Sequence, residues 1–304
     1  MRAIIPDSGL VMVIGGIGAV YDVEILDLNE QKNVTLKKPA DLPHSLYGMV
    51  AGVVGGQIMV CTGYDVSDCY VYDFALNQWN ETVSLYAERY GGMGFVSSED
   101  RWHILGGEDL NPLAHYLDTS VFYTQGASAF ETGGKLPYQG AFGCVATVNA
   151  THVFFAGGWD GYKYRKDAHL LEVAEWRWTR LPDMSVERAD QSCGRVGKNN
   201  ILVIGGTPEG ARETSEVFNL LTGERYEGPA LPTETGALYG VSQVYQVDET
   251  FFVIGGKAGT DDLLDSVYEV DAESFALRLR DERLVTAREA HAVVPIPKEM
   301  LREM

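Results

Sequence analysis

Histidine is the side chain most often used to bind a transition metal or to move a proton near neutral pH. The six histidines of this sequence stand at scattered places, in different kinds of predicted element: His44, His103, His115, His152, His169 and His291. No Gly-x-Ser-x-Gly turn, Gly-rich phosphate loop or closely spaced set of metal ligands accompanies them. The sequence therefore predicts no catalytic residues, no metal site and no cofactor.

A different kind of chemistry is indicated by the segment 159–166, WDGYKYRK. It interleaves three aromatic and three basic side chains: Trp159, Tyr162, Lys163, Tyr164, Arg165 and Lys166. Aromatic residues and Arg carry much of the energy of protein interfaces, because they bury a large area at a small cost in entropy. We expect this loop to contact an acidic or aromatic peptide. The alternative is a solvated loop whose Trp159 folds back onto the domain.

The elements that must position these residues form a repeat. An apolar run closed by a Gly pair, or by Thr-Gly in one case, recurs six times: VMVIGG, IMVCTG, WHILGG, VFFAGG, ILVIGG and FFVIGG. The pairs begin at positions 15, 62, 106, 157, 205 and 255, so successive pairs lie 44 to 51 residues apart. A period near fifty residues indicates one supersecondary unit repeated along the chain.

Other positions recur in phase with the Gly pairs. A second short strand ends in a hydrophobic residue followed by an acid or Asn: Leu26-Asp27, Tyr72-Asp73, Leu171-Glu172, Phe218-Asn219 and Val270-Asp271. A large aromatic residue follows in three units, as Trp79, Phe130 and Trp178. A link that often contains Arg then leads to a further apolar strand. This pattern predicts four short strands per unit.

A repeat with these features resembles the kelch repeat, and six copies resemble a six-bladed kelch β-propeller. The resemblance covers nearly the whole chain. It implies an all-β fold with four-stranded antiparallel blades in a single domain, 1–304. The expected blades are about 1–37 plus 291–296, 47–84, 91–134, 140–180, 192–228 and 238–280. Two departures are Thr62, in place of the first Gly in blade 2, and His44, at the Arg position of blade 1.

The C-terminal segment 291–296, HAVVPI, follows Arg288 as the first strands of other units follow their links. We expect it to become the innermost strand of blade 1 and to close the ring. Closure by the end of the chain removes the open sheet edges that would otherwise promote aggregation. The short segment Arg2–Ile5 is the other candidate for a first strand of blade 1.

In kelch proteins that this chain resembles, partner peptides or proteins bind one face, which we call the loop face. It is formed by the loops after the Gly pairs and by the links between blades. The resemblance implies a non-catalytic protein-interaction module, monomeric by itself, that binds a peptide or protein there. We expect eight residues to make partner contacts: Trp159, Tyr162, Tyr164, Arg165, Arg89, Arg188, Arg212 and Arg288. Alternatively, Arg89, Arg188 and Arg288 brace adjacent blades through backbone carbonyls.

Some kelch-type propellers are enzymes. A copper-radical oxidase requires a His pair, a Tyr and a Tyr-Cys crosslink near the axis, and the scattered histidines do not provide the pair. A sugar mutarotase would need only a few Arg and Glu residues at the channel mouth, and Glu187, Arg188 and Arg288 could supply them. A sugar-binding or mutarotase-like enzyme is therefore the alternative function, and a secreted kelch scaffold is a third.

The chain is strongly acidic, with 24 Lys and Arg against 43 Asp and Glu and a net charge of −19. Such a charge repels nucleic acid and anionic lipid, and it favours either a basic partner or solubility alone. No apolar run approaches the ~20 residues of a membrane span, and the first residues, MRAIIPDSGL, have no long apolar core of a signal peptide. We expect no binding to nucleic acid or membrane, and a cytoplasmic location.

The cysteines and glycosylation sequences keep a secreted location as the alternative. Cys61 and Cys69 flank a short hairpin loop, and Cys144 and Cys193 begin the first strands of blades 4 and 5. We expect small, buried, reduced residues, with a disulfide in each pair as the alternative. Asn-x-Thr sequences occur at Asn33, Asn80 and Asn149, where glycans would be carried in a secreted chain.

Overall fold

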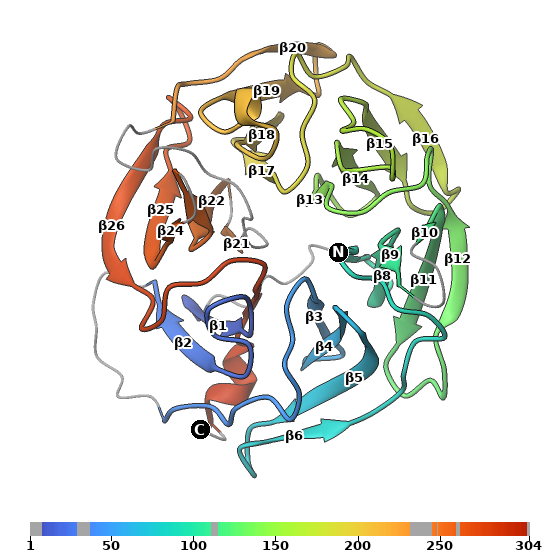
Figure 1. The fold of residues 1–304 in the computed structure, drawn as a ribbon, viewed down its shortest axis with the longest axis vertical. Helices are drawn as coiled ribbons and strands as arrows, with labels where there is room; N and C mark the ends of the chain where they lie inside the picture. The colour runs from blue at the N-terminus through green and yellow to red at the C-terminus, as the bar shows by residue number, and fades with distance from the viewer. Residues whose placement is uncertain are drawn as a thin grey trace.

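The computed structural model describes residues 8–28, 37–110, 115–231, 245–247, 249–259 and 262–302. Within these ranges, six antiparallel sheets surround a central axis, which confirms the six-bladed β-propeller (Figure 1). The described helices are two short 3-10 turns, η1 (Glu209–Ala211) and η3 (Lys298–Arg302). Among the described residues, no helix has the length and apolar character needed to span a membrane.

Blades 2 to 6 each contain four described strands, which run in order from the innermost to the outermost. The strands of blades 2 to 4 are β3 (Val50–Val54), β4 (Gln57–Gly63), β5 (Val66–Asp73) and β6 (Gln78–Glu81); β7 (Met93–Val96), β8 (Arg101–Leu105), β11 (Thr119–Thr124) and β12 (Glu131–Lys135); and β13 (Cys144–Thr147), β14 (His152–Ala156), β15 (Ala168–Glu172) and β16 (Arg177–Arg180). Those of blades 5 and 6 are β17 (Ser192–Val196), β18 (Asn200–Ile204), β19 (Ser215–Asn219) and β20 (Glu224–Glu227); and β21 (Tyr245–Val247), β22 (Thr250–Ile254), β25 (Ser266–Val270) and β26 (Leu277–Arg283).

Two small hairpins extend the loops that follow the Gly pairs of blades 3 and 6. They consist of β9 (Glu108–Asp109) with β10 (His115–Tyr116), and of β23 (Lys257–Ala258) with β24 (Asp262–Leu263). Both therefore belong to the loop face.

Blade 1 is completed from the far end of the chain. Its described strands are β1 (Leu10–Ile14) and β2 (Val23–Asp27), and β27 (Ala292–Pro295) pairs antiparallel with β1 on the inner side. Met12 lies opposite Val294, and Val13 lies opposite Val293. This confirms that the C-terminal strand closes the ring. The other candidate first strand, Arg2–Ile5, lies outside the described residues.

The Gly pairs let the blades approach one another closely. The second Gly of blade 4, Gly158, has φ 103°, and a Cβ placed on it would lie 2.7 Å from the carbonyl oxygen of Ala141 in the preceding link. No larger residue fits there without moving backbone. Thr62, the departure in blade 2, also adopts a positive φ of 56°. Its hydroxyl accepts a hydrogen bond from the Arg89 amide at 2.8 Å, so the substitution supplies a contact that Gly cannot make.

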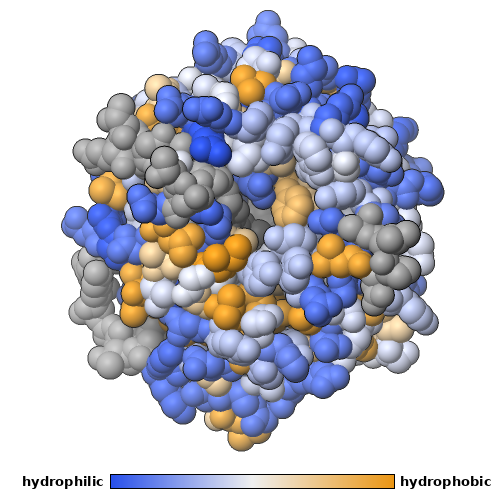
Figure 2. All heavy atoms as spheres, in the orientation of Figure 1, coloured by the Kyte–Doolittle hydropathy of each residue, from blue (hydrophilic) through white to orange (hydrophobic). Residues whose placement is uncertain are grey.

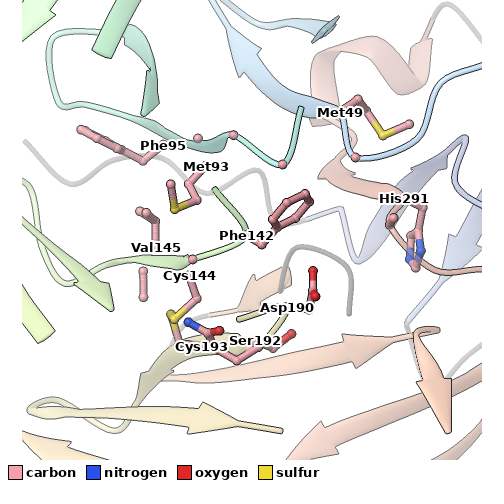
Figure 3. Close-up of a pocket in the computed structure, with 18 of the residues that line it drawn as sticks. Met49, Met93, Phe95, Phe142, Cys144, Val145, Asp190, Ser192, Cys193 and His291 are labelled. Atoms are coloured by element: carbon pink, nitrogen blue, oxygen red, sulfur yellow. A yellow bond between two sulfur atoms is a disulfide. The ribbon is translucent and has the colours of Figure 1, made fainter. Parts of the chain in front are cut away.

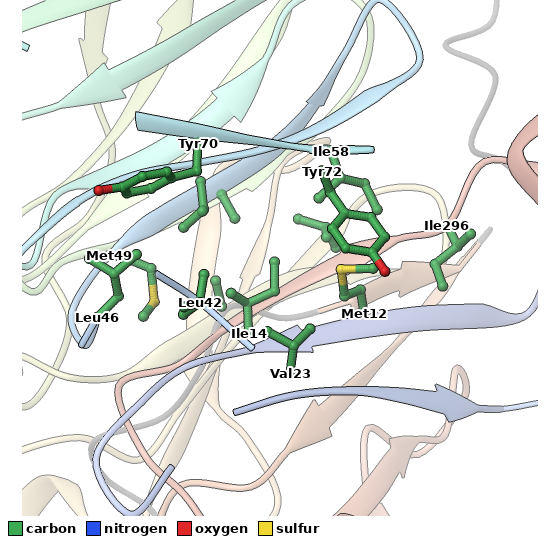
Figure 4. Close-up of a cluster of buried hydrophobic side chains, with 14 of the residues drawn as sticks. Met12, Ile14, Val23, Leu42, Leu46, Met49, Ile58, Tyr70, Tyr72 and Ile296 are labelled. Carbon is green, nitrogen blue, oxygen red and sulfur yellow. The ribbon is translucent and has the colours of Figure 1, made fainter. Parts of the chain in front are cut away.

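The core lies between the blades, because each sheet packs against a neighbour on both faces. All five residues of β1 are buried, without the alternation expected of a sheet with one solvated face. Figure 4 shows Met12 and Ile14 of blade 1 gathered with Ile58 and Tyr72 of blade 2, and Ile296 joins the same cluster from the closing segment.

The in-phase Trp residues also connect neighbouring blades. Trp79 donates its indole N–H to the carbonyl of Ala40 at 3.0 Å, and Trp178 donates to Lys135 in β12 at 2.8 Å. Each ring thus lies on the chain that precedes its own blade.

The four cysteines are paired, so the expectation of reduced thiols was wrong and the disulfide alternative holds. Cys61 and Cys69 lie directly opposite each other on β4 and β5, with their Cα atoms 4.1 Å apart. Cys144 and Cys193 join the innermost strands of blades 4 and 5, with Cα atoms 5.8 Å apart. The second bridge therefore crosslinks two blades beside the axis, which a reading of strand spacing within blades could not establish.

Deletion of residues 290–304 is expected to destabilise the protein strongly. It removes the inner partner of β1 together with Val293, Val294 and Ile296, which are buried. Each buried side chain of this kind contributes about 1.5–3 kcal/mol, so the melting temperature should fall by more than about 10 °C. Calorimetry of the truncated chain beside one that lacks only residues 303–304 tests this. An unchanged melting temperature would mean that ring closure does not stabilise the fold.

Candidate functional site: the channel mouth

A chain of backbone hydrogen bonds runs around the axis where the innermost strands begin. The amide of Gly48 donates to Ala290 at 2.7 Å, that of Gly91 to Gly48 at 3.0 Å, that of Phe142 to Gly91 at 2.8 Å, and that of Asp190 to Phe142 at 2.8 Å. Each bond joins one blade to the next. We call these five residues the axial ring.

All five residues of the axial ring have left-handed backbone, with φ between 51° and 64°. Glycine adopts this conformation freely, and at two positions it also makes room. A Cβ on Gly48 would lie 2.3 Å from the Tyr90 ring, and one on Gly91 would lie 2.3 Å from the Phe142 ring. Phe142, Asp190 and Ala290 are not glycines. The conformation costs about 1–2 kcal/mol for Phe142 and for Ala290, and less for Asp190. Strain of this kind gathers at functional sites, where the fold holds a side chain in a particular direction.

The axial ring surrounds the mouth of a central cavity of about 480 Å³. This is within the usual range for a ligand site of roughly 300–1,000 Å³. Apolar groups such as Met93 and Val145 line the wall, together with the Cys144–Cys193 bridge. Figure 3 shows Phe142 and Asp190 directed into this space from neighbouring blades.

Asp190 is the most unusual carboxylate of the mouth. Burial raises its pKa to about 6, and the negative charge of Glu289 raises it further, while the Thr207 hydroxyl and Lys257 act in the opposite direction. The Thr207 hydroxyl lies 3.4 Å from the carboxylate. Glu289 forms a salt bridge with Lys257, at 3.2 Å. Asp190 is thus a carboxyl group inside a cavity that is mostly charged at pH 7 and gains its proton near pH 6.

Aromatic rings connect this cavity with the outer part of the loop face. Tyr64 stacks on Tyr47 at 5.3 Å, both meet Tyr90, and the Tyr90 ring packs edge-on against Phe142 at 5.0 Å. Burial and the charges of Tyr47, Asp190 and Glu108 raise the pKa of Tyr90 well above its usual range. The four rings form what we call the aromatic rim.

Arg89, Arg188 and Arg288 are buried, which corrects the contact role expected for them. Their exposed fractions are 5%, 0% and 0%. Each guanidinium reaches the next blade and donates to the carbonyl of the first Gly of its pair: Arg89 to Gly106 at 2.7 Å, Arg188 to Gly205 at 2.8 Å and Arg288 to Gly15 at 3.1 Å. The bracing alternative therefore describes these three residues.

The three braces differ in their charge environment. Arg188 also pairs with the buried Glu216 at 2.7 Å, and Arg288 pairs with Glu24 and with Asp22. Arg89 instead bonds the carbonyl and hydroxyl of Thr119, and burial lowers its pKa to about 10 despite the opposing charge of Asp109. Three residues could have supplied a mutarotase-like site. Of these, Arg188 and Arg288 are buried and Glu187 is exposed.

The position in blade 1 that matches these Arg residues is Leu46, not His44. The Leu46 carbonyl accepts a hydrogen bond from Gly16, as that of Arg188 does from Gly158 and that of Arg288 from Gly256. Before blade 4 the same place is held by Gly140, whose carbonyl accepts from Gly107. Backbone carbonyls make this contact, so the residue type there can vary.

The segment 159–166 lies on the loop face, but its parts differ in exposure. Tyr162 is 87% exposed, whereas Trp159 and Tyr164 are half-buried and pack against each other at 4.8 Å. Arg165 bonds Asp160 at 3.0 Å and Asp167 at 2.8 Å, and it lies over the Tyr138 ring. Two carboxylates therefore neutralise the cation that was expected to attract an acidic peptide.

The last contact residue expected from the sequence, Arg212, follows η1 in the loop of blade 5. It is half-buried, and its Nη1 lies 3.5 Å from the carbonyl of Gly259 in the loop of blade 6. The structure therefore does not bring the eight expected residues together into one surface.

The buried histidines are structural. Burial and Arg101 lower the pKa of His103 to about 4, and burial and Arg288 lower the pKa of His291 to about 3. Both are therefore neutral near pH 7. In the described part of the chain, no group of three or more His, Cys, Asp or Glu residues is arranged to hold a metal ion.

Sequence reasoning missed the axial ring and with it Asp190 and Phe142. One signal was available. In three links the ring residue stands two places after the bracing Arg, as Gly91, Asp190 and Ala290. Among these, Asp190 is the one charged side chain, and alignment of the links would have placed it at the axis.

Comparisons with known proteins agree with this architecture. No protein-family model matches the chain. Kelch domain-containing protein 10 of Xenopus tropicalis is 25% identical over 217 residues, 64% of this chain and 52% of that protein, and the Homo sapiens protein is 25% identical over 218 residues, 64% and 49%. Kelch-like protein 40 of Xenopus tropicalis is 26% identical over 170 residues, 55% of this chain and 27% of that protein. The chain thus spans about half the length, or less, of these curated relatives.

A solved structure shows the same fold at lower sequence identity. The structure of YjhT superposes with a TM-score of 0.76 at 12% identity and covers 92% of this chain and 99% of that one. At this identity the likeness establishes the propeller fold alone.

Replacement of Arg188 by Met is expected to destabilise the fold by about 3–5 kcal/mol, because it leaves the buried Glu216 without its nearest cation. Arg177→Met is the matched control. Arg177, on the outermost strand β16, is 69% exposed and pairs with Glu172 of β15, so its loss should cost less than about 1 kcal/mol. Urea denaturation of both variants measures the difference. If Arg188→Met left stability unchanged and weakened only partner capture, the bracing assignment would be overturned.

Proposed function

We propose that this chain, a six-bladed β-propeller with kelch homologues, is a non-catalytic interaction module that binds a peptide or protein partner on its loop face. Curated relatives with kelch names support this assignment. The observation that carries it is the distribution of exposed hydrophobic side chains.

Large hydrophobic residues that are well exposed concentrate on the loop face. Those in its loops and links are Ile17, Tyr21, Tyr64, Tyr86, Tyr162 and Val285. Tyr86 and Val285 stand at the same place in two links, three residues before the bracing Arg, and they are 100% and 89% exposed. Exposed apolar groups bordered by polar residues are typical of protein-binding surfaces.

This surface is continuous with the channel. Tyr64 is exposed at one end of the aromatic rim, and Phe142 reaches the cavity at the other. In the view of Figure 2, hydrophobic residues gather around the central hollow and hydrophilic residues dominate toward the edge. Loops held by a rigid ring of sheets lose little entropy when a partner binds, which favours recognition.

Within the segment 159–166, Tyr162 is the contact residue that its exposure supports best. The Trp159 and Tyr164 rings pack against each other within the same segment. Arg165 fixes the loop through Asp160 and Asp167. A partner that presents aromatic or aliphatic groups suits this arrangement better than an acidic one.

The two disulfides support the secreted alternative for the compartment over the cytoplasmic one, because disulfides persist in oxidising environments. Two of the Asn-x-Thr sequences stand in the described part of the chain, where Asn149 is exposed and Asn80, on β6, is half-buried. Asn33 lies outside the described residues.

Tyr162→Ala combined with Tyr86→Ala is expected to weaken capture of the partner from an extract of the source tissue by at least tenfold, because exposed aromatic anchors contribute most at interfaces. Titration of captured protein against immobilised propeller measures the change.

The matched control is Leu76→Ala combined with Leu221→Ala. These residues are 67% and 77% exposed and stand at turns between the third and fourth strands, on the face opposite to the loops. Capture should be unchanged in this control. Equal losses in the two double variants, or none in either, would contradict a loop-face site.

A further inference from the structure

The mouth of the channel combines three features that suit a cation. Asp190 projects a carboxylate into the cavity, the Phe142 ring stands beside it, and the Tyr90 ring packs edge-on behind Phe142 at 5.0 Å. Aromatic faces attract ammonium and guanidinium groups, and the attraction grows when the site is shielded from water. A carboxylate beside an aromatic ring therefore offers charge and stacking to the same group.

The charged side chains around the mouth are mainly acidic, which also favours a cation. Glu289 from the link to blade 1, Glu108 from the loop of blade 3 and Asp190 all influence the ionisation of Tyr90. Lys257 is the cation that faces Asp190, and it lies 3.2 Å from Glu289. None of the salt bridges in the described ranges of the chain includes Asp190. With a net charge of −19, the whole molecule also attracts cations to this mouth.

The fold fixes the direction of the Asp190 side chain. Its left-handed φ of 54° and its amide bond to the Phe142 carbonyl fix the backbone, so the side chain extends over the cavity of about 480 Å³. The equivalent residues Gly48, Gly91 and Ala290 present no polar side chain there. Asp190 is the one acidic residue of the axial ring, which indicates that a single charged group binds at its side of the mouth.

We propose that the channel mouth binds the guanidinium or ammonium group of a basic side chain, presented by a peptide docked on the loop face, with Asp190 as its carboxylate acceptor and Phe142 stacked against it. The assignment rests on the loop-face function in one respect only, that the rest of the peptide lies on that face. It names the chemistry of one partner residue, an Arg or a Lys.

The proposal has a pH signature. A cation beside Asp190 favours its charged form, so binding lowers the raised pKa and releases protons near pH 6. Since the free carboxyl has a pKa of about 6, it is mostly charged at pH 7 and mostly neutral at pH 5. Affinity should therefore be about tenfold weaker at pH 5 than at pH 7. The groups that face Asp190 are Glu289, Lys257, Tyr90 and Thr207.

The test uses calorimetric titration of the whole chain with three probes: the peptide acetyl-Ala-Arg-Ala-amide, its citrulline analogue, and ethylguanidinium. Citrulline keeps the shape of Arg but lacks the charge. We expect the Arg peptide to bind at least tenfold tighter than the citrulline peptide, and tighter than ethylguanidinium. If ethylguanidinium bound as tightly as the peptide, a free small cation would replace the peptide as the ligand and the proposal would be overturned.

Asp190→Asn should remove the difference between the Arg and citrulline peptides. Asp65→Asn is the matched control, because Asp65 is an exposed loop-face residue with a similar left-handed φ of 58°, and this variant should bind like the wild type. Unchanged preference for Arg in Asp190→Asn, or no binding of the Arg peptide to the wild type, would overturn the proposal.

The measurement of affinity against pH needs no substitution, and an affinity that stays constant between pH 5 and 7 would also contradict the proposal. Partner capture by the Tyr162 variant is measured separately, so either proposal can fail alone.

Discussion

The structure depends on how six sheets are brought together at one axis. Where the innermost strands begin, neighbouring blades lie so close that their backbones form hydrogen bonds with each other. The amides of Gly48, Gly91, Phe142 and Asp190 donate these bonds. These bonds require left-handed conformations and leave little space for side chains. The Gly pairs meet the same requirement farther from the axis, where Gly158 and Gly206 approach the carbonyls of the preceding links. The recurrence of glycine is thus a consequence of crowding near the axis.

Crowding also gathers carbonyl oxygens at the junctions, and three buried guanidiniums bond them. Arg89, Arg188 and Arg288 stand at alternate junctions, between blades 2 and 3, 4 and 5, and 6 and 1. The planar guanidinium suits this task because it donates several hydrogen bonds in fixed directions. The Cys144–Cys193 bridge reinforces the junction between blades 4 and 5. The junctions between blades are thus fixed independently of the loops above them.

The period, the blade count and the closing strand were predictable from sequence, because each depends on local patterns. Apolar runs such as 201–204 result from burial on both faces of a sheet, and Gly pairs result from the close approach of neighbouring blades. Both can be recognised in the sequence. The roles of Arg89 and Arg188 were not predictable, since an Arg in a link can equally face solvent or a carbonyl of the next blade. The same holds for Cys193, whose partner lies 49 residues away in another sheet. Asp190 was missed because its importance comes from the axis, which no short segment of sequence contains.

Hydrogen exchange of the axial-ring amides tests the central claim most directly. If backbone bonds between blades hold the mouth of the channel, the amides of Gly48, Gly91, Phe142 and Asp190 should exchange only through global unfolding, as slowly as those of the buried second strands. Exchange as fast as that of the exposed loop residues, for example Tyr86, would show that the mouth opens locally. In that case neither a rigid loop face nor a directed Asp190 could be maintained.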